Sequence, residues 1–418
     1  MRVFQKRRYC YILAWLALAA SVGAVGLLGG REAGPAAQPE APPAHKPVAE
    51  ASPTASESRH TGLAGVWVPY MSLVGKEHTQ EAFEANFRSI ADSAKEKNFT
   101  ALFVHVRAFC DALYPSKLYP WSHLLTGRQG QDPGFDPLEF MVSYTHSLGM
   151  EFHAWLNPLR VSTGETPAEL SQDNPYLSLK DEYPYYFMES GSACYLNPAY
   201  PYIRTLIAEG AAEIAENYPV DGIHFDDYFY PTQEESLDAE AYQLHVETVE
   251  SPLPLNQWRT ANISAMVSEV YDRVKAANPQ VKFGISPQGN LENDRNMGAD
   301  VEAWCAAPGY LDYICPQLYY GFENETLPYT EALRQWTELY RCEGIELYVG
   351  LALYKAAGDT QEAGWDTGRV ISQQIQEAQS AQCNGIILYS SAYLDAEAAR
   401  QEVEGAVEAL SGGIVGAE

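Results

Sequence analysis

The sequence predicts an α/β protein built around a (β/α)8 barrel, and three observations support this prediction. From Gly62 onward, short β-branched runs alternate with longer amphipathic stretches, which is typical of βα units around a parallel sheet. Eight such runs occur, the number that a closed barrel of this kind requires. The chain has 418 residues and is 46% hydrophobic, enough to form such a barrel and fill its core.

The predicted strands are short runs rich in Val, Ile, Phe and Tyr. They cover residues 64–70, 100–107, 150–157, 220–227, 281–287, 311–317, 346–353 and 384–390. An open doubly wound sheet is the alternative arrangement of the same units, but it needs a glycine-rich phosphate turn after its first strand. The segment "VPYMSLVGKE" contains no such turn. The closed barrel is therefore favoured.

The helices predicted between these strands have apolar residues at i, i+3 and i+4. Examples cover residues 79–98, 200–217, 258–278 and 367–382. Thr79 precedes Glu81 and Ala82 at the start of the first of these, so we expect it to be the N-cap residue. We expect the barrel to span residues 62–411 and to be followed by a disordered tail over 412–418.

The segment before the barrel predicts export. Residues 1–31 begin with basic side chains and continue as an uncharged apolar run, which is typical of a signal peptide or a membrane anchor. The run is long enough to cross a bilayer, and both readings stay open. Residues 32–61 are rich in Ala, Pro and Glu and predict a flexible linker. The expected location is extracytoplasmic, secreted or anchored to the envelope, with membrane contact only through this segment.

Charge and cysteine content narrow the choice of partners. The net charge is −28, which argues against nucleic acid or another polyanion and favours a neutral or cationic ligand. The seven cysteines are scattered, with no CxxC pair, so disulfides and buried free thiols both remain open. No dinucleotide, Walker or GxSxG motif occurs, and we expect no cofactor. The oligomeric state does not follow from the sequence.

Polar residues gather where the predicted strands end, and in such barrels that rim carries the active site. These residues are His105, Arg107, Asp111, His153, Asn157, Arg160, His224, Asp226, Asp227, Gln317, Tyr319, Tyr389 and Ser390. Burying such groups costs free energy unless they are paired or used, so together they indicate a site. Three histidines among them raise a zinc alternative, but no HxH or HExxH motif supports it, and we expect no metal.

The fourth strand places two adjacent carboxylates at this rim. Strand alternation puts His224 and Asp226 on one face, and the apolar Ile223 and Phe225 on the other. The apolar pair suits the layer beneath the helices, so Asp226 should point into the barrel mouth. Two neighbouring carboxylates tend to have their pKa values driven apart, as cleavage of a glycosidic bond requires. The alternative is structural: Asp226 pairs with an arginine and Asp227 caps the next turn.

Several long motifs resemble the glycosyl-hydrolase-like 10 family of bacterial envelope proteins. They are "CDALYPSKLYPWSHLLTGRQGQDPGFDPLEFM", "GMEFHAWLNPLRVS", "YLNPAYPYIRTLI" and "DGIHFDDYFYP", in the family's order. The resemblance runs from about Gly65 to Tyr393 and implies a TIM barrel that acts on glycans. Cys110 stands where a glycine is more usual. A looser similarity to chitinase-type barrels places Asp221, Asp226 and Tyr319 in their pattern, but Tyr228 stands in place of the acid glutamate.

The resulting hypothesis is an exported glycosidase that cleaves an N-acetylhexosamine polymer, with denuded peptidoglycan strands as its substrate. Asp226 is the central carboxylate, Asp227 is the first choice for the acid/base and Asp111 is the rival. The expected sugar-binding residues are Arg107, His153, Asn157, Arg160, His224, Gln317, Tyr319 and Tyr389. Trp67, Trp155 and Tyr389 are candidates for stacking on sugar rings. The competing hypotheses are a non-catalytic glycan-binding barrel and, ranked last, a metal-dependent deacetylase.

Overall fold

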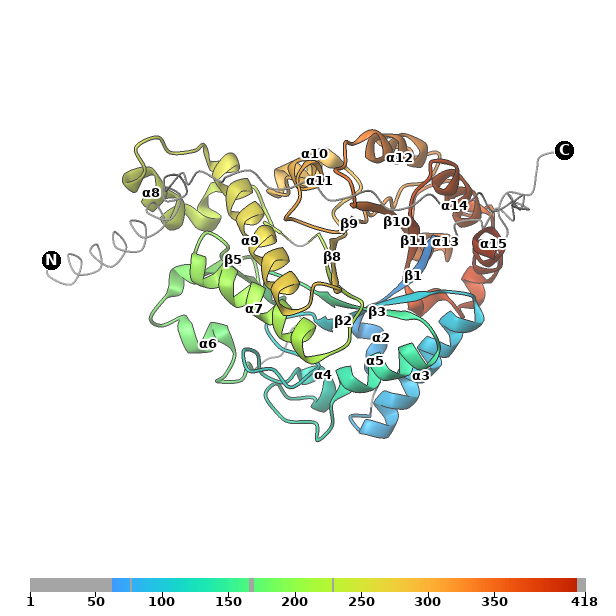
Figure 1. The fold of residues 1–418 in the computed structure, drawn as a ribbon, viewed down its shortest axis with the longest axis horizontal. Helices are drawn as coiled ribbons and strands as arrows, with labels where there is room; N and C mark the ends of the chain where they lie inside the picture. Colours follow the sequence, from blue (N-terminus) through green and yellow to red (C-terminus); the bar gives the residue numbers. More distant parts are fainter. Residues whose placement is uncertain (1–61, 76, 165–168, 228, 412–418) are drawn as a thin grey trace, which may run out of the picture. The chain divides into compact units, whose positions relative to one another are not determined.

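The structure, a computed structural model, describes residues 62–75, 77–164, 169–227 and 229–411 (Figure 1). These residues form a closed barrel of eight parallel strands in the order β1-β11-β10-β9-β8-β7-β3-β2. The predicted fold class is therefore confirmed. The signal or anchor segment, the linker and the tail predicted from the sequence lie outside the described residues.

Each of the eight predicted runs overlaps a barrel strand. The strands are β1 (Leu63–Val68), β2 (Ala101–Arg107), β3 (Glu151–Leu156), β7 (Gly222–Phe225), β8 (Lys282–Ile285), β9 (Tyr313–Ile314), β10 (Glu346–Ala352) and β11 (Gly385–Tyr389). Most are shorter than predicted at their C-terminal ends. The residues beyond those ends, such as Asp226 and Gln317, leave the main strand ladder and form the barrel mouth.

Eight helices surround the described barrel, one between each strand and the next and one after the last (Figure 1). They are α3 (Gln80–Glu96), α5 (Pro137–Ser147), α7 (Pro201–Asn217), α9 (Leu255–Ala277), α11 (Val301–Ala306), α12 (Tyr329–Glu338), α14 (Val370–Ser380) and α15 (Arg400–Ser411). The Thr79 hydroxyl accepts a hydrogen bond from the Ala82 N–H at 3.2 Å, so the predicted cap of α3 is confirmed.

Further helices occupy the loops. They are α2 (Tyr70–Leu73), α4 (His123–Thr126), α6 (Pro175–Leu179), α8 (Ala239–Thr248), α10 (Leu291–Asn296), α13 (Leu353–Ala356), and the 3-10 helices η1 (Pro184–Tyr186), η2 (Glu235–Asp238), η3 (Ser391–Tyr393) and η4 (Glu397–Ala399). Every helix among the described residues is too short or too polar to cross a membrane. The six described cysteines are free thiols, and Cys10 lies outside the described residues.

A second, small sheet follows β3. Its strands are β4 (Arg160–Ser162), β5 (Phe187–Ser190) and β6 (Ala193–Leu196), paired antiparallel in the order β4-β6-β5. No strand was predicted between residues 157 and 200. Three or four residues per strand are too few for alternation to be recognised. We call these three strands the inserted sheet.

The barrel separates two hydrophobic cores. The larger one lies between the strands and the helices and includes Ile223 and Phe225, whereas Trp67 and Trp155 belong to a smaller cluster with Phe103 and Tyr313. The smaller cluster consists of alternate residues of the strands, which places it inside the barrel. Strand alternation thus correctly assigned the apolar face of β7 to the helix layer.

Two glycines make room inside the barrel below the mouth pocket. A Cβ on Gly222 would lie 2.1 Å from His153 Nδ1, and one on Gly284 would lie 2.1 Å from the Tyr313 ring. No side chain fits at these distances, so the glycines allow His153 and Tyr313 to fill the barrel axis. Polar side chains therefore lie below the mouth as well as within it.

Candidate active site

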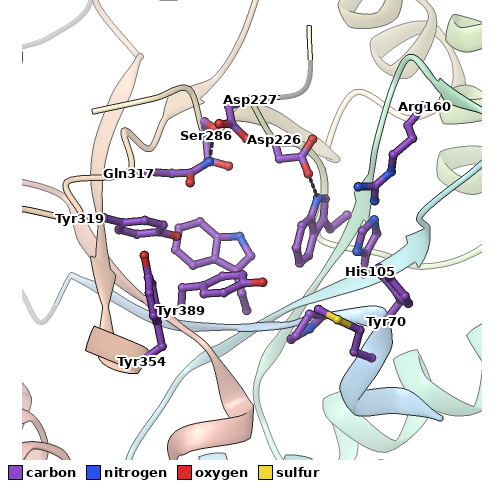
Figure 2. Close-up of a pocket in the computed structure, with 14 residues that line it drawn as sticks. Tyr70, His105, Arg160, Asp226, Asp227, Ser286, Gln317, Tyr319, Tyr354 and Tyr389 are labelled. Atoms are coloured by element: carbon purple, nitrogen blue, oxygen red, sulfur yellow. Dashed lines mark hydrogen bonds between the residues drawn. The ribbon is translucent and has the colours of Figure 1, made fainter. Parts of the chain in front are cut away.

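A cavity of about 300 Å³ opens where the barrel strands end, and all eight strands or the loops after them contribute to its wall. Figure 2 shows Asp226 and Asp227 side by side at one edge of this cavity and a row of tyrosines along another. The lining residues are Trp67, Pro69, Tyr70, Met71, His105, Trp155, Arg160, Asp226, Asp227, Ser286, Gln317, Tyr319, Tyr354 and Tyr389. We call this cavity the mouth pocket.

Asp226 is held in the pocket by the strand next to its own. Phe225 pairs with Leu156 of β3, so the residue after β7 lies level with the residue after β3. As a result, Asn157 donates its amide N–H to Asp226 Oδ2, and Trp155 Nε1 donates to the same oxygen at 3.0 Å. The carboxyl is only 3% exposed and both of these partners are donors. Asp226 is thus a fixed acceptor at the pocket wall.

Asp227 lines the same pocket but lies in a different environment. Burial raises the pKa of its carboxyl above the ordinary value, and hydrogen bonds from Gln317 and Gln288 only partly oppose this. Behind Gln288 lies Asp294, which accepts the Gln288 backbone N–H at 2.9 Å and whose own pKa is raised by burial and by the Asp227 charge. A proton on Asp227 is therefore favoured relative to an exposed aspartate.

His105 also lines the pocket; it was predicted as a strand-end residue and considered only as a ligand in the zinc alternative. Its ring stacks on Trp155 with centroids 3.9 Å apart. Burial, together with the charge of Arg160 and the proximity of His224, lowers its pKa well below the ordinary value, which keeps the imidazole neutral. Alternation along β2 carries the signal: Ala101 and Phe103 belong to the barrel interior, so His105 continues that face.

Tyrosines and tryptophans form much of the remaining wall. Tyr319 and Tyr389 have ring centroids 6.0 Å apart, and Trp67 lies 6.1 Å from Tyr389. Tyr354 on α13 and Tyr70 on α2 extend this aromatic wall, and neither was predicted. Flat apolar faces with polar edges suit a ligand such as a sugar ring, which has C–H groups on its faces and hydroxyls around its rim.

Arg160 and Gln317 are predicted sugar-binding residues that line the pocket, and each is held by a backbone oxygen. Arg160 Nε donates to Ala108 O at 2.8 Å, and its guanidinium lies 4.9 Å from the Phe109 ring centroid. Gln317 Nε2 donates to Ser286 O at 3.0 Å. These bonds fix both side chains before any ligand arrives, which reduces the entropy lost on binding.

Arg107 and Asp111 lie outside the pocket lining, although both follow from the strand-end rule. Between His105 and Arg107 the pairing of β2 with β3 skips a residue, and this β-bulge turns Arg107 away from the barrel axis. Its guanidinium lies 4.5 Å from the Tyr119 ring centroid. Asp111 is buried and accepts a hydrogen bond from Gln129 Nε2 at 3.0 Å. Neither residue therefore joins Asp226 in lining the mouth pocket.

His224 and His153 lie below the pocket in a hydrogen-bonded series that we call the lower column. Its four members are His224, Tyr313, His153 and Glu151. Trp67 Nε1 donates to His224 Nε2 at 3.1 Å, so His224 Nδ1 carries the proton and donates to Tyr313 O–H at 3.0 Å. Burial lowers the pKa of His224, consistent with this neutral form.

The lower column continues to the N-terminal end of the barrel. The Tyr313 hydroxyl oxygen lies 3.4 Å from His153 Nδ1, and His153 Nε2 lies 3.0 Å from Glu151 Oε2. His224 and His153, which were predicted to bind sugar, thus contact other side chains within the barrel and are absent from the lining of the mouth pocket. Among the described residues, no group of three His, Cys, Asp or Glu side chains is arranged to hold a metal ion.

The chitinase-type pattern fits only in part. Asp221 lies at the opposite end of β7 from the pocket, where its carboxylate accepts the Phe152 backbone N–H at 2.7 Å and lies 2.8 Å from His146 Nε2. Tyr319 lines the mouth pocket, and Tyr228 lies outside the described residues. The chemistry available at the mouth is thus that of Asp226 and Asp227 in different environments.

Curated relatives share this chain's sequence over most of its length. It is 33% identical over 309 residues to the glycosyl hydrolase YngK of Bacillus subtilis, covering 69% of this chain and 58% of YngK, so the chain spans less than two thirds of that relative. It is 31% identical over 395 residues to the glycosyl hydrolase DigH of Escherichia coli K12, covering 87% of this chain and 89% of DigH.

Solved glycoside hydrolases share the fold. The glycoside hydrolase domain of PgaB (BpsB) from Bordetella bronchiseptica superposes with a TM-score of 0.54 at 13% identity, covering 83% of this chain and 98% of that one. The catalytic domain of β-amylase from Paenibacillus polymyxa gives 0.54 at 11% identity, covering 84% and 97%. At these identities the likeness concerns the fold alone. Residues 63–367 match the family description "Glycosyl hydrolase-like 10", and the chain belongs to that family.

Proposed function

We propose that the chain is an exported glycoside hydrolase that cleaves an N-acetylhexosamine polymer, with peptidoglycan strands free of stem peptides as its substrate. The observation that carries this proposal is the pair of neighbouring carboxylates in one pocket. Asp226 accepts hydrogen bonds from Trp155 and Asn157, whereas burial favours a proton on Asp227. Glycosidic cleavage uses such a pair, one group as acid and the other as nucleophile or base.

In this mechanism Asp227 protonates the oxygen of the leaving sugar. As the glycosidic bond breaks, Asp226 stabilises the positive charge that develops on the other sugar, either directly or by orienting the acetamido group of the substrate. Water then adds to that sugar carbon and gives a proton back to Asp227, which restores both carboxyl groups. The N–H groups of Trp155 and Asn157 hold the Asp226 carboxylate in place during this step. His105, kept neutral by its surroundings, is available as a hydrogen-bond partner for a sugar hydroxyl.

A neutral polymer fits the charge and the surface of the protein. The net charge of −28 repels polyanions, and the pocket wall combines tyrosine and tryptophan rings with fixed amide and guanidinium groups. Arg160 and Gln317, which line the pocket, would bind acetamido or hydroxyl oxygens of the polymer. The predicted export segment would bring the enzyme to such strands in the cell envelope.

The second candidate is a glycan-binding barrel without turnover. The aromatic wall favours it, because Tyr319, Tyr354 and Tyr389 would serve binding alone equally well. This candidate gives no reason for two adjacent carboxylates in the same pocket.

The experiment is incubation of the purified protein with glycan strands stripped of stem peptides, followed by measurement of new reducing ends. The proposed hydrolase produces reducing ends in proportion to time and protein, and Asp226→Asn produces almost none. A binding barrel retains the strands on the protein without new reducing ends, and that result would refute the proposed function.

A further inference from the structure

Five tyrosines gather beside the inserted sheet and have no role in the function proposed above. They are Tyr183, Tyr185, Tyr186, Tyr200 and Tyr202, and we call them the tyrosine cluster. Three come from the segment "YPYY" at η1, and two come from "YPY" at the start of α7. Two segments on either side of the β5–β6 hairpin thus present the same kind of side chain to one another.

The rings of the cluster are ordered rather than randomly packed. Tyr186 is nearly parallel to Tyr183, with centroids 5.0 Å apart and an angle of 13°, and nearly parallel to Tyr202, at 5.3 Å and 10°. Tyr185 and Tyr200 contact Tyr186 at 5.1 and 5.2 Å. Tyr202 is 51% exposed although one ring face is covered by Tyr186, so its other face is open to solvent.

The cluster lies on the same side of the barrel as the mouth pocket. Arg160 lines the pocket and is also the first residue of β4, where it pairs with Tyr195 of β6. Tyr195 pairs in turn with Met188 of β5, two residues after Tyr186. Two strand spacings separate β4 from β5, a distance of roughly 10 Å. The inserted sheet therefore connects the pocket wall with the tyrosine cluster.

The position of α7 agrees with this placement. The helix connects the end of the inserted sheet, on the mouth side, with the N-terminal end of β7, so its first residues, which include Tyr202, lie at the mouth end of the barrel. A polymer whose scissile bond lies at Asp226 extends beyond the pocket on either side. The inserted sheet gives it one path, over Arg160 toward Tyr202.

The chemistry of the cluster selects a neutral glycan as the ligand. Open tyrosine faces attract the C–H faces of sugar rings, and their hydroxyl edges offer hydrogen bonds. The acidic side chains next to the cluster, Asp181, Glu182 and Glu189, repel anionic polymers. A solvent-exposed aromatic face also leaves apolar area in water that a flat ligand would cover.

We propose that the tyrosine cluster is a second glycan-binding site that holds the polymer outside the mouth pocket. The inference rests on the proposed function for the identity of the polymer, but it does not require that the polymer be cleaved. It assigns to the exposed ring of Tyr202 a contact with a sugar several units away from the scissile bond. Short oligosaccharides that fill only the mouth pocket do not reach it.

The test compares Tyr202→Ala with Tyr340→Ala in a protein carrying Asp226→Asn, so that binding is measured without cleavage. Tyr340 is 70% exposed and follows α12, whose C-terminal end lies at the end of the barrel opposite the mouth pocket. Tyr340 is therefore a matched control. Binding to purified denuded glycan strands is measured by co-sedimentation. Tyr202→Ala should weaken binding about three- to tenfold, and Tyr340→Ala should leave it unchanged.

A second variant and a second substrate complete the test. Tyr183→Ala, at the other end of the ring stack, should weaken strand binding in the same direction. With Asp226 intact, Tyr202→Ala should keep the turnover of a short N-acetylhexosamine oligosaccharide and raise only the KM for long strands. Unchanged strand binding in both tyrosine variants, or equal loss in Tyr340→Ala, would overturn the inference, as would absence of strand binding by the parent protein.

The two proposals fail in different ways. If the parent protein binds strands through Tyr202 but releases no reducing ends, the glycan-binding role of the cluster is supported and the hydrolase proposal is refuted. If reducing ends appear and Tyr202→Ala binds strands as the parent does, the hydrolase stands and the cluster falls.

Discussion

The upper and lower halves of the barrel interior both contain buried polar side chains, but they use them differently. In the lower column, His224, Tyr313 and His153 bond to one another along the axis and end at Glu151. In the mouth pocket, the polar groups of Asp226, Asp227 and other lining residues face a cavity large enough for a ligand. The column lies in the filled part of the barrel, whereas the mouth lies at its open end.

This difference separates the residues that stabilise the fold from those that serve the proposed function. A buried polar group that is already hydrogen-bonded contributes to the uniqueness of the fold, and removing its partner costs stability. A group that faces a cavity and is desolvated without full pairing is a cost to the fold, which is typical of catalytic sites. We therefore expect substitutions in the mouth to change turnover and substitutions in the column to change the free energy of unfolding.

The largest effect is expected from Asp226→Asn. The substitution removes the charge that stabilises the developing cation while preserving the shape of the side chain, so turnover on denuded strands should fall roughly 10³- to 10⁴-fold. The variant should still fold, although its free energy of unfolding should fall by about 1–3 kcal/mol because the Trp155 and Asn157 donors lose their acceptor charge, and circular dichroism checks this.

Asp111→Asn is the matched control for this substitution. Asp111 is equally buried, but its contacts are Gln129 and His123 outside the pocket lining. Turnover per folded molecule should remain within about threefold of the parent, and stability should fall by about 1–3 kcal/mol because buried donors lose their acceptor charge. A loss of turnover as large as that of Asp226→Asn would reinstate Asp111 as the rival carboxylate.

Asp227→Asn should reduce turnover by roughly 10²-fold and change its pH dependence. Because burial raises the pKa of Asp227, the active protonated form persists to higher pH than for an ordinary aspartate, and kcat/KM falls as pH rises through that pKa. The variant should lack this basic limb. A pH profile of kcat/KM for both proteins measures this, and an unchanged basic limb in the variant would assign the acid to another group.

The raised pKa of Asp227 favours activity but lowers the stability of the fold. An acid whose pKa is higher in the folded state destabilises the fold above its unfolded-state pKa, because the unfolded chain loses the proton more readily. Asp227→Asn should therefore melt at a higher temperature than the parent at pH 7. The difference should vanish below about pH 4, the range of an unperturbed aspartate.

Tyr313→Phe is expected to act on stability alone. It removes the hydroxyl between His224 and His153 and leaves two buried ring nitrogens without that partner. The free energy of unfolding should fall by about 1–3 kcal/mol, measured by urea denaturation. Turnover per folded molecule should change less than about threefold, and a larger change would mean that the column also tunes the mouth.

The smallest effect is expected at the foot of the column. The hydrogen bond from His153 lowers the pKa of Glu151, so this pair stabilises the fold above the unfolded-state pKa and its contribution is lost as pH falls through the folded-state pKa. Since the Glu151 side chain is 46% exposed, Glu151→Gln should cost less than about 1 kcal/mol at pH 7. Melting temperatures of both proteins from pH 7 to pH 3 should converge at the acid end.

The fold and the centre of the site could be predicted because both follow from local patterns. Eight β-branched runs indicated the barrel strands, and alternation along β7 separated Asp226 from the helix-facing Phe225. How close each residue lies to the mouth could not be predicted, because it depends on the register between neighbouring strands. His153 pairs with Gly222, well below Asp226, and this pairing is not visible in one sequence.

Two further differences have physical causes that single-sequence patterns do not carry. Arg107 is turned outward by a β-bulge, which depends on the neighbouring strand. The loop that contains Asp111 folds back on Gln129, and this long-range contact has no periodic signature. The inserted sheet was not predicted for a third reason, because its strands are too short for alternation to appear.

The most direct test of the central claim is a crystal structure of the Asp227→Asn variant with a bound N-acetylhexosamine oligosaccharide. We expect a glycosidic oxygen within hydrogen-bond distance of residue 227, the adjoining sugar against Asp226, and sugar rings stacked on the tyrosines of the mouth pocket. Sugar density elsewhere on the protein, with the mouth pocket empty, would contradict it.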